Sequence, residues 1–301
     1  MTGPRAQRGA AVIVALLAVA VAVSMVGSAF WRQNVMFRQV ENERSFAQVD
    51  WLMRAAVDWA RLVLAEDART SSVDHAGEPW ALRIAETRVD TDAEGVAAYV
   101  EGGMQDAQSK YNLANLAQAG LALPAERACL RRLFAGTGVP LTLVEPIAAY
   151  VVQASAIDPA IGAGSGAHLL YTLDDLREIP GLSSEHLRQL RQHLTVLPKP
   201  TAVNANTASA EVLAALLPDL ALSAARRLVA SREQAYFKDL NDVLTRLPGA
   251  PLVASGAKLA VGTRFFLLDG RASYAKARLH MQALLERDDE HVTVVWRREL
   301  P

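Results

Sequence analysis

The longest hydrophobic run of the chain lies near its N-terminus. Residues 10–30 carry no charged side chain, and about 20 apolar residues at a rise of about 1.5 Å each span the hydrocarbon core of a bilayer. Arg5 and Arg8 precede the run, and Trp31 and Arg32 follow it. Basic residues favour the cytoplasmic side, and Trp is typical of the membrane interface. The pattern predicts a transmembrane helix with a cytoplasmic N-terminus.

Apolar residues then recur with a helical period. Residues 31–64 contain no Pro or Gly. We therefore expect one continuous helix over residues 5–64, embedded in lipid in its first half and amphipathic in its second. The polar stretch 67–72 should end in a loop. The apolar stripe of the second half consists of Met36, Val40, Phe46, Met53, Val57, Ala60 and Leu64.

Alternating patterns after this helix predict strands. We expect strands over 79–86 and 96–101, the second closed by Gly102-Gly103, and closing strands over 264–268 and 291–296. Residues 274–286 fit a strand or a helix, and the pattern does not decide between them. A helix followed by antiparallel strands predicts an α+β fold in which the sheet buries one face on the helix.

The middle of the chain, from Leu113, is rich in Ala and Leu and predicts helices. Pro124 opens one helix, and residues 140–153 form another. The glycines of 162–166 lack a preceding strand and the G-x-G-x-x-G spacing, so we expect a connection there and no phosphate site.

A short pattern recurs in this helical region. Thr172 and Asp175 predict a capped helix start. Residues 175–182, 212–220 and 243–249 each resemble a short helix that ends at Pro-Gly or Pro-Asp, and the first two restart at Ser183 and Ser223. Serine is a favoured N-cap residue, so the repeats predict helix–hairpin–helix units.

Three interpretations fit the N-terminal segment. A cleavable secretory signal would have a shorter apolar region, about 7–15 residues, and could be cut near Val26–Ala29. A plain signal anchor would hold an unrelated domain at the membrane. The third interpretation rests on Gly9, which directly precedes the apolar helix and resembles the processing site of type IV pilin-like proteins, cut between Gly9 and Ala10. Ordinary pilins carry Glu at the fifth mature position, where this chain has Val14.

This departure is itself informative, because the chain resembles the minor pseudopilin K family of type II secretion systems. That family lacks the fifth-position Glu and is about twice the usual pilin length. Residues 105–116 (QDAQSKYNLANL) resemble the family motif where the core domain meets its helical insert. Residues 203–208 (VNANTA), followed by 211–213 (EVL), match a second motif, and 265–267 (FFL) resemble a strand near the C-terminus.

The resemblance implies a domain organisation. A pilin helix packs on an antiparallel sheet, and an all-α insert of two SAM-like modules interrupts the core. The expected units are a cytoplasmic leader (1–9), the transmembrane helix (10–30), the first part of the core (31–112), two helical modules (113–200 and 201–257) and the C-terminal strands (258–301).

The resemblance also implies a role. The chain would be a non-enzymatic subunit of the bacterial inner membrane, with its bulk in the periplasm, that caps the pseudopilus tip and helps to initiate assembly. A prepilin peptidase would cleave it, and Ala10 would be methylated. Its partners would be the major pseudopilin and the I- and J-type minor pseudopilins, packed along the stripe from Met36 to Leu64 and the core.

Composition excludes several other classes. The 31 basic and 32 acidic residues give a net charge of −1, so no global attraction to nucleic acid or anionic membranes is expected. Cys129 is the only cysteine, which excludes an intrachain disulfide, and we expect it to be a buried apolar residue. The six histidines show no H-E-x-x-H or paired-ligand spacing, and no Ser lies in a nucleophile elbow, so no catalytic residue and no cofactor are predicted. The histidines are His75, His168, His186, His193, His280 and His291.

A membrane-anchored DNA-uptake receptor is the alternative function, because helix–hairpin–helix units and the motif at 204–208 also occur in competence-type receptors. Backbone N–H groups of glycine-rich hairpins hold phosphate in such units, but the hairpin 218–222 has no glycine and carries Asp219. We therefore expect no nucleic-acid binding, and Asn206 and Thr207 should be caps. The cations Arg226, Arg227 and Arg232 are offset by Asp219, Glu233, Asp239 and Asp242.

The family resemblance suggests a calcium site, but we expect none in this chain. The acidic clusters that supply oxygen ligands in family members fall on 149–152 (AYVV) and 166–169 (GAHL) in this chain. Calcium needs six to eight oxygen ligands, and these segments supply no carboxylate. Asp158, Asp174 and Asp175 remain nearby without ligand spacing, which leaves open whether a residual site survives.

Overall fold

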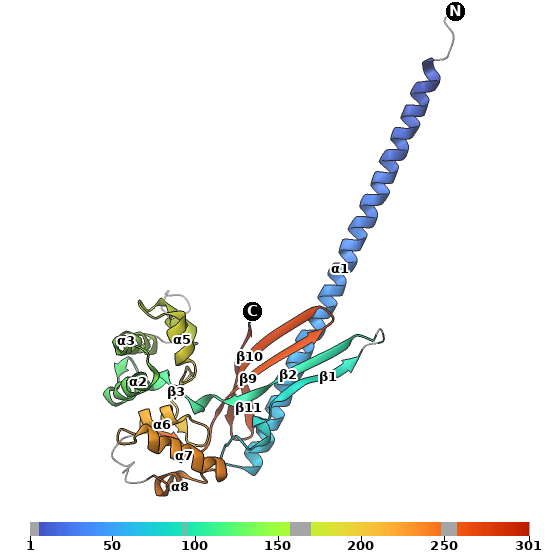
Figure 1. The fold of residues 1–301 in the computed structure, drawn as a ribbon. Helices are drawn as coiled ribbons and strands as arrows, with labels where there is room; N and C mark the ends of the chain where they lie inside the picture. The colour runs from blue at the N-terminus through green and yellow to red at the C-terminus, as the bar shows by residue number, and fades with distance from the viewer. Residues whose placement is uncertain (1–5, 92, 94, 157–169, 248–257, 301) are drawn as a thin grey trace, which may run out of the picture.

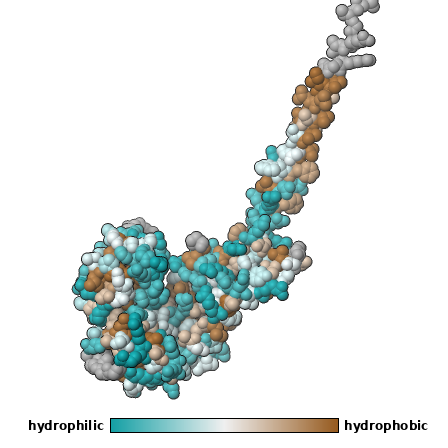
Figure 2. All heavy atoms as spheres, viewed as in Figure 1, coloured by the Kyte–Doolittle hydropathy of each residue, from teal (hydrophilic) through white to brown (hydrophobic). Residues whose placement is uncertain are grey.

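A computed structural model describes residues 6–91, 93, 95–156, 170–247 and 258–300. Helix α1 (Ala6–Thr70) projects far beyond the rest of the molecule (Figure 1). Every side chain from Ala11 to Arg44 is exposed, and the apolar half of α1 forms the brown end of the molecule in Figure 2. Among the described residues, α1 is the one helix long and apolar enough to cross a membrane. The predicted continuous helix is confirmed, and it extends past Leu64 to Thr70.

A five-stranded antiparallel sheet lies against the C-terminal half of α1, with the strand order β1-β2-β9-β10-β11. The helical insert enters the chain between the neighbouring strands β2 and β9, so the two chain segments of the core pair directly (Figure 1). The strands are β1 (Ile84–Thr91), β2 (Ala97–Asp106), β9 (Phe265–Tyr274), β10 (Ala277–Asp288) and β11 (His291–Leu300).

The core between α1 and the sheet uses only part of the predicted stripe. Val49, Met53, Ala60 and Leu64 have no exposed surface, and they pack against residues of β2, β9 and β10. Full burial of one such large side chain contributes about 1.5–3 kcal/mol, so this face holds α1 on the sheet. The N-terminal part of the predicted stripe is exposed, because α1 extends past the sheet there. Met36, Val40 and Phe46 are 65%, 62% and 58% exposed.

Two predicted strand boundaries are wrong. The segment 79–86 begins as a 3-10 turn, η1 (Pro79–Ala81), and the strand starts only at Ile84. The strand predicted to end at Gly102-Gly103 continues to Asp106. Gly102 has a φ of +152°, and a Cβ there would lie 2.4 Å from the carbonyl oxygen of Asp269 on β9. These glycines therefore permit the close approach of two strands and do not end one.

Residues 274–286, which fitted either element, are mostly strand β10. The strands expected at 264–268 and 291–296 exist and extend to Tyr274 and Leu300. Leu284 and Leu285 are both buried, on opposite faces of the sheet. Adjacent buried residues obscure the alternation that marks a strand with one wet face, which explains the ambiguity.

The insert is helical, as predicted, and its two expected modules share one hydrophobic core. Short parallel pairs β3–β6 (Tyr111–Asn112 with Leu194–Thr195) and β7–β8 (Val203–Asn204 with Leu259–Ala260) tie it together, beside the small hairpin β4–β5 (Ala117–Gln118, Leu121–Ala122). The glycine segment 162–166 lies outside the described residues. The helices are α2 (Pro124–Thr137), α3 (Val144–Ser155), η5 (Leu173–Glu178), α5 (Ser184–Leu190), α6 (Ala210–Leu216), α7 (Leu222–Gln234) and α8 (Leu240–Thr245).

The predicted helix starts have mixed outcomes. Thr172 and Asp175 form a capping box, although the helix they open is a 3-10 helix. Ser183 caps α5 by accepting from the backbone N–H of His186. Ser223 does not cap α7, since that helix starts at Leu222. Of the third repeat, helix α8 is described, whereas Pro248-Gly249 lies outside the described residues.

The close contact at Gly102 predicts a large effect of one methyl group. We expect Gly102→Ala to lower the free energy of unfolding by at least about 2 kcal/mol, because β2 and β9 must separate or the backbone must leave its positive φ. Thermal melting of the full chain in detergent micelles measures this. Gly136→Ala is the matched control, since nothing lies within 4 Å of its added Cβ in α2. That control should stabilise the chain by about 0.5–1 kcal/mol, and equal effects of the two changes would contradict the assignment.

Candidate functional site: the anchor helix and the core–insert junction

The residues predicted to be processed lie in the first turns of α1. Gly9 and Ala10 are helical, and Val14 follows one turn later with its side chain 66% exposed. From Ala11 to Arg44 every side chain of this segment is exposed in the part of the chain that the structure describes. An uncharged helix of this kind requires a lipid or protein environment.

The two sequence motifs meet at the carboxylate of Asp106, the last residue of β2. Oδ2 of Asp106 accepts from Asn204 Nδ2 at 2.9 Å and from Thr207 Oγ1 at 2.5 Å. Oδ1 accepts from the backbone N–H of Gln108 at 2.7 Å. Burial raises the pKa of Asp106 from 3.8 to about 6, and the hydrogen bonds from Thr207, Thr263, Gln108 and Asn204 oppose that rise. The joint between core and insert is therefore a buried carboxylate surrounded by donors.

The rest of the first motif clamps the linker between the two predicted modules. Asn112 donates to the carbonyl of Lys199 at 2.8 Å, and its oxygen accepts from the N–H of Leu197. Asn115 makes a two-way pair with the backbone of Thr201, at 2.8 and 2.9 Å. Buried amide side chains satisfy backbone groups that have no strand partner. This motif therefore holds the segment that links the two predicted modules.

Asn206 and Thr207 are not helix caps, which corrects the expectation from the sequence. Asn206 donates to the carbonyl of Phe237 at 2.9 Å and accepts from the N–H of Phe237 at 2.7 Å. Thr207 donates to Asp106 across the junction. Helix α6 is capped by Ser209 instead, whose hydroxyl accepts from the N–H of Val212. The polar side chains of this motif form tertiary contacts, and the cap of α6 comes from Ser209, which follows the motif.

A buried ion pair next to this joint was not found from the sequence. Arg287 on β10 donates to Asp67 at the end of α1 and to Asp74 in the following loop, each at 2.6 Å. The carbonyl of Asp74 accepts from Asn204 at 3.0 Å, which connects this ion pair to the junction. The two carboxylates lie 220 and 213 positions from Arg287 in the sequence, and no local motif marks them.

The electrostatics of this ion pair are dominated by burial. Burial and the nearby Glu78 charge raise the pKa of Asp67 to about 6, against the opposing effect of Arg287. Burial likewise raises the pKa of Asp74. Removing one partner of a buried ion pair commonly costs about 3–5 kcal/mol, because the other charge is left unpaired.

This acidic group is also the one place in the described residues where carboxylates gather. Oxygens of Asp67, Asp74 and Glu78 lie within 4.8 Å of one another. They are already engaged, since Arg287 supplies the positive charge and Glu78 accepts from Trp80 Nε1 at 2.7 Å and from the N–H of His75 at 2.9 Å. The donor set fits a guanidinium group better than a metal ion.

The residues considered for a residual calcium site are used structurally. Asp174 pairs with Arg177 and Arg191, and Asp175 accepts from the N–H groups of Tyr171 and Thr172. Of the segments where family members carry acidic clusters, 149–152 lies in α3. Asp158 and the segment 166–169 lie outside the described residues. That the chain binds no metal stays a prediction.

Two of the cations considered for DNA binding contact other groups of the chain, and that the protein binds no nucleic acid stays a prediction. Arg232 donates to the carbonyl of Ala205 at 2.6 Å, and burial lowers the pKa of its guanidinium to about 10. Arg226 lies 3.8 Å from Glu211. Cys129 is buried, as expected, and burial raises the pKa of its thiol to about 12.

Individual histidines have separate structural environments. His75 stacks on Tyr236 with ring centroids 4.0 Å apart. His186 completes the capping box of α5, and His280 pairs with Asp269 at 3.2 Å. His168 lies outside the described residues. These three histidines serve packing, capping and ion pairing, and that the chain has no catalytic residue stays a prediction.

The long apolar helix α1, the sheet packed on it and the inserted helical region define an α+β protein with a helical insert. The family model "Type II secretion system (T2SS), protein K" matches residues 203–262, which include the motif at 203–208. The chain is similar over more than nine tenths of its length to three proteins named type II secretion system protein K. The predicted family resemblance is thereby confirmed.

Known relatives cover nearly all of the chain. Type II secretion system protein K of Pseudomonas aeruginosa is 25% identical over 317 residues, covering 98% of this chain and 93% of that protein. The protein of the same name from Aeromonas hydrophila is 26% identical, covering 93% and 90%. A chain in the crystal structure of the GspK-GspI-GspJ complex from enterotoxigenic Escherichia coli has the same fold, with a TM-score of 0.70 at 20% identity, covering 87% of this chain and 99% of that one.

The raised pKa of Asp106 predicts how stability depends on pH. The folded chain holds a proton on Asp106 up to about pH 6, whereas the unfolded chain releases it near pH 3.8. The free energy of unfolding therefore falls as pH rises through this window, by about 3 kcal/mol from this one group. We expect Asp106→Asn to remove that fall, since the amide does not titrate. Urea denaturation of the full chain in micelles at pH 4 and pH 7 measures it.

Asp58→Asn is the control for this measurement. The side chain of Asp58 is 69% exposed, and among the described residues its one ion pair is with Arg61, so its loss should leave the pH dependence unchanged. If Asp106→Asn and the unsubstituted chain lose the same stability between the two pH values, the carboxylate of Asp106 does not titrate as inferred.

Proposed function

We propose that the protein is a minor pseudopilin that caps the tip of the periplasmic pseudopilus and helps to initiate its assembly for protein export across the outer membrane. The observation that carries this proposal is the placement of the insert. It lies beside the C-terminal end of α1, at the opposite end of the molecule from the apolar N-terminal half (Figure 1). A subunit held in the membrane by that half carries its bulk at the far end, where another subunit would have to stack.

Val14 supports the same position. In a growing filament the fifth-position Glu of an incoming subunit is thought to pair with the terminal amine of the subunit above it. An unpaired carboxylate in the bilayer costs several kcal/mol, so that pairing recruits new subunits. A subunit with Val14 gains nothing from a neighbour above it and suffers no penalty without one, and it can therefore be the first and topmost subunit.

The proposed partners are the I- and J-type minor pseudopilins beside the tip and the major pseudopilin below it. The similar Escherichia coli chain was crystallised in a GspK-GspI-GspJ complex, which supports this choice. The expectation that partners pack along the whole stripe from Met36 to Leu64 is wrong, because the chain's own sheet covers Met53, Ala60 and Leu64. Apolar side chains of α1 that remain exposed beside the sheet are Trp51, Trp59 and Leu62, at 67%, 41% and 70%.

We further propose the domain limits inferred from the sequence, with helical modules over 113–200 and 201–257 of SAM-like type. The turn at Gly181, with a φ of +85°, leads into the capped helix α5 and supports a hairpin in the first module. Helices α6 and α7 flank the corresponding turn of the second. The chain would cross the inner membrane once, with a cytoplasmic N-terminus and a periplasmic bulk, and act without catalysis.

Processing is the first test of this proposal. We expect mass spectrometry of the membrane-extracted protein to find an N-terminus at Ala10, methylated, because a prepilin peptidase would cleave after Gly9. Gly9→Val should block cleavage, since its branched side chain obstructs the approach of the peptidase to the backbone. Gly27→Val, in open space within α1, is the control and should be processed normally. A mature chain that begins near Ala29 would show an ordinary signal peptide and contradict the proposal.

Partner binding is the second test. We expect Leu62→Ser to reduce co-purification of the full chain with I- and J-type pseudopilins at least fivefold, because it removes a 70% exposed apolar side chain from the proposed interface. Leu121→Ser is the matched control, at 71% exposure on the insert, and should co-purify normally. Val14→Glu should leave complex formation intact, since residue 14 lies in the bilayer.

The tip position itself is tested by stoichiometry. Purified pseudopili should contain the protein in far smaller amounts than the major subunit, with tagged copies at one end. Labelling along the whole filament would contradict the tip position while leaving membership of the pseudopilus intact.

A further inference from the structure

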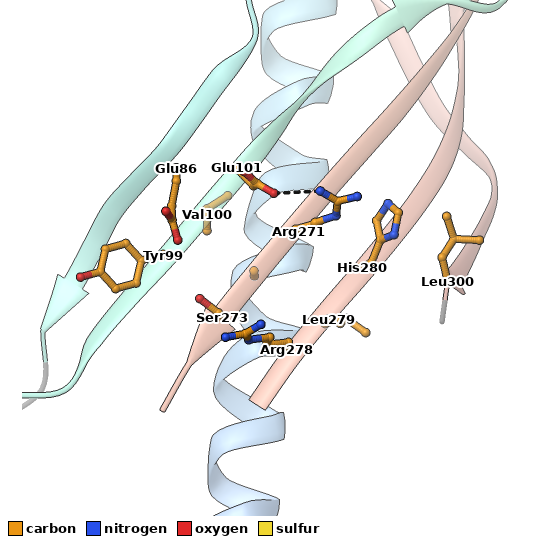
Figure 3. Close-up of a pocket in the computed structure, with 11 residues that line it drawn as sticks. Glu86, Tyr99, Val100, Glu101, Arg271, Ser273, Arg278, Leu279, His280 and Leu300 are labelled. Carbon is orange, nitrogen blue, oxygen red and sulfur yellow. Dashed lines mark hydrogen bonds and ion pairs between the residues drawn. The ribbon is translucent and has the colours of Figure 1, made fainter. Parts of the chain in front are cut away.

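The outer face of the sheet, opposite α1, carries a trough that the proposed assembly does not use. At one end it is a groove of about 540 Å³ between β1 and β11. Figure 3 shows side chains of Tyr99, Glu101, Arg271, His280 and Leu300 along this face. Charges of both signs line the groove, and Arg271 pairs with Glu101 at 3.2 Å.

At its other end the trough becomes a cleft of about 220 Å³ between the sheet and the insert. Strands β9, β10 and β11 form the floor, and segments of the insert around Tyr171 and Arg191 form the wall. This volume is below the roughly 300 Å³ of ordinary small-molecule sites. The cleft therefore suits one or two side chains of a larger partner.

The groove and the cleft are continuous along paired strands. His280 lies opposite Leu300, Gln282 opposite Arg298, and Leu284 opposite Trp296, in consecutive positions of the same face. The first pair lines the groove and the other two line the cleft. Alternate residues of a strand advance about 6.6 Å, so the three pairs form a track of about 13 Å, which matches four or five residues of extended peptide.

The cleft is cationic and contains no compensating acid. Lys110, Arg191 and Arg298 line it, and no Asp or Glu is among its lining residues. Arg191 is paired with Asp174 outside the cleft. In the part of the chain that the structure describes, Lys110 and Arg298 form no ion pair.

Both uncompensated cations are held in place by neutral groups. Arg298 donates to Gln282 Oε1 at 2.8 Å and lies 5.2 Å above the ring of Trp296. Lys110 donates to the carbonyl of Arg191 at 2.7 Å, and burial together with the Arg191 charge lowers the pKa of Lys110. The carboxylate of Asp269 accepts from Gln282 Nε2 at 2.7 Å and lies 3.2 Å from His280 Nε2. Cations that are held in place by neutral groups can bind an anionic group of another molecule.

We propose that this trough binds an extended segment of a partner protein that carries aspartate or glutamate side chains between apolar ones. An acidic side chain enters the cleft between Lys110 and Arg298, an apolar side chain of the same segment contacts Trp296, and the segment continues over the groove. A nucleic acid fits less well, because it carries a phosphate at every nucleotide and would meet Glu86 and Glu101 in the groove, whereas a peptide can place apolar residues there. This inference goes beyond the proposed tip position and does not depend on it.

The test uses the full chain in nanodiscs of zwitterionic lipid and fluorescence anisotropy at low salt. The probe is an acetylated and amidated peptide of alternating leucine and aspartate, and the control peptide replaces aspartate by asparagine. We expect the acidic peptide to bind at least tenfold more tightly. Arg298→Gln and Lys110→Gln should each weaken its binding at least fivefold, whereas Arg298→Lys should keep most of it.

Arg226→Gln is the matched control variant, since it removes one positive charge from a 67% exposed position of the insert outside the cleft. It should bind the acidic peptide like the unsubstituted chain. Near-UV circular dichroism of each variant confirms that the sheet and insert remain packed. Because two separate cleft residues are replaced, a folding defect in one of them does not decide the outcome.

Several results would overturn the inference. These are equal affinity for the two peptides, no saturable binding of the acidic peptide up to 1 mM, or equal effects of Arg298→Gln and Arg226→Gln. Tighter binding of a six-nucleotide oligothymidylate would assign the trough to nucleic acid. Binding only of a peptide with a free carboxyl terminus would assign it to a chain end. None of these results bears on the tip position, which the pseudopilus stoichiometry decides separately.

Discussion

The carboxylate of Asp106 is buried between the core and the insert, and a buried charge must be surrounded by donors. Asn204, Thr207 and the backbone of Gln108 supply them. These donors come from both sequence motifs, 105–116 and 203–208. Their hydrogen bonds therefore fix the position of residues 204–207 of the insert against the end of β2. The clamps made by Asn112 and Asn115 then hold the adjoining linker.

The same network reaches helix α1. Asn204 also contacts the carbonyl of Asp74, and Asp74 and Asp67 share the guanidinium of Arg287. The end of α1, the sheet and the insert are thus joined by one set of buried hydrogen bonds and ion pairs. These contacts attach the insert to the C-terminal end of α1 and to the sheet.

Local patterns determined the parts of the structure that depend on neighbours in sequence. The charge-free run, the helical stripe ending at Leu64, the capping box of Thr172 and Asp175, and the cap at Ser183 all follow from residues within a few positions of one another. The two motifs at 105–116 and 203–208 were also recognisable as family features. Their position in the fold was expected, although the roles of Asn206 and Thr207 were not.

Only the tertiary structure decided which distant groups meet. Arg287 and Asp67 are 220 residues apart, and nothing near either residue specifies the other. Asn206 bonds to Phe237 because the folded chain brings that backbone segment to it, whereas the sequence alone favours a local cap. Burial on both faces hid the alternation of β10, and Gly102 is required by the approach of a strand that lies beyond the whole insert. Sequence by itself determined the elements and the anchor, and packing determined the junction and the trough, since those depend on contacts that no local pattern encodes.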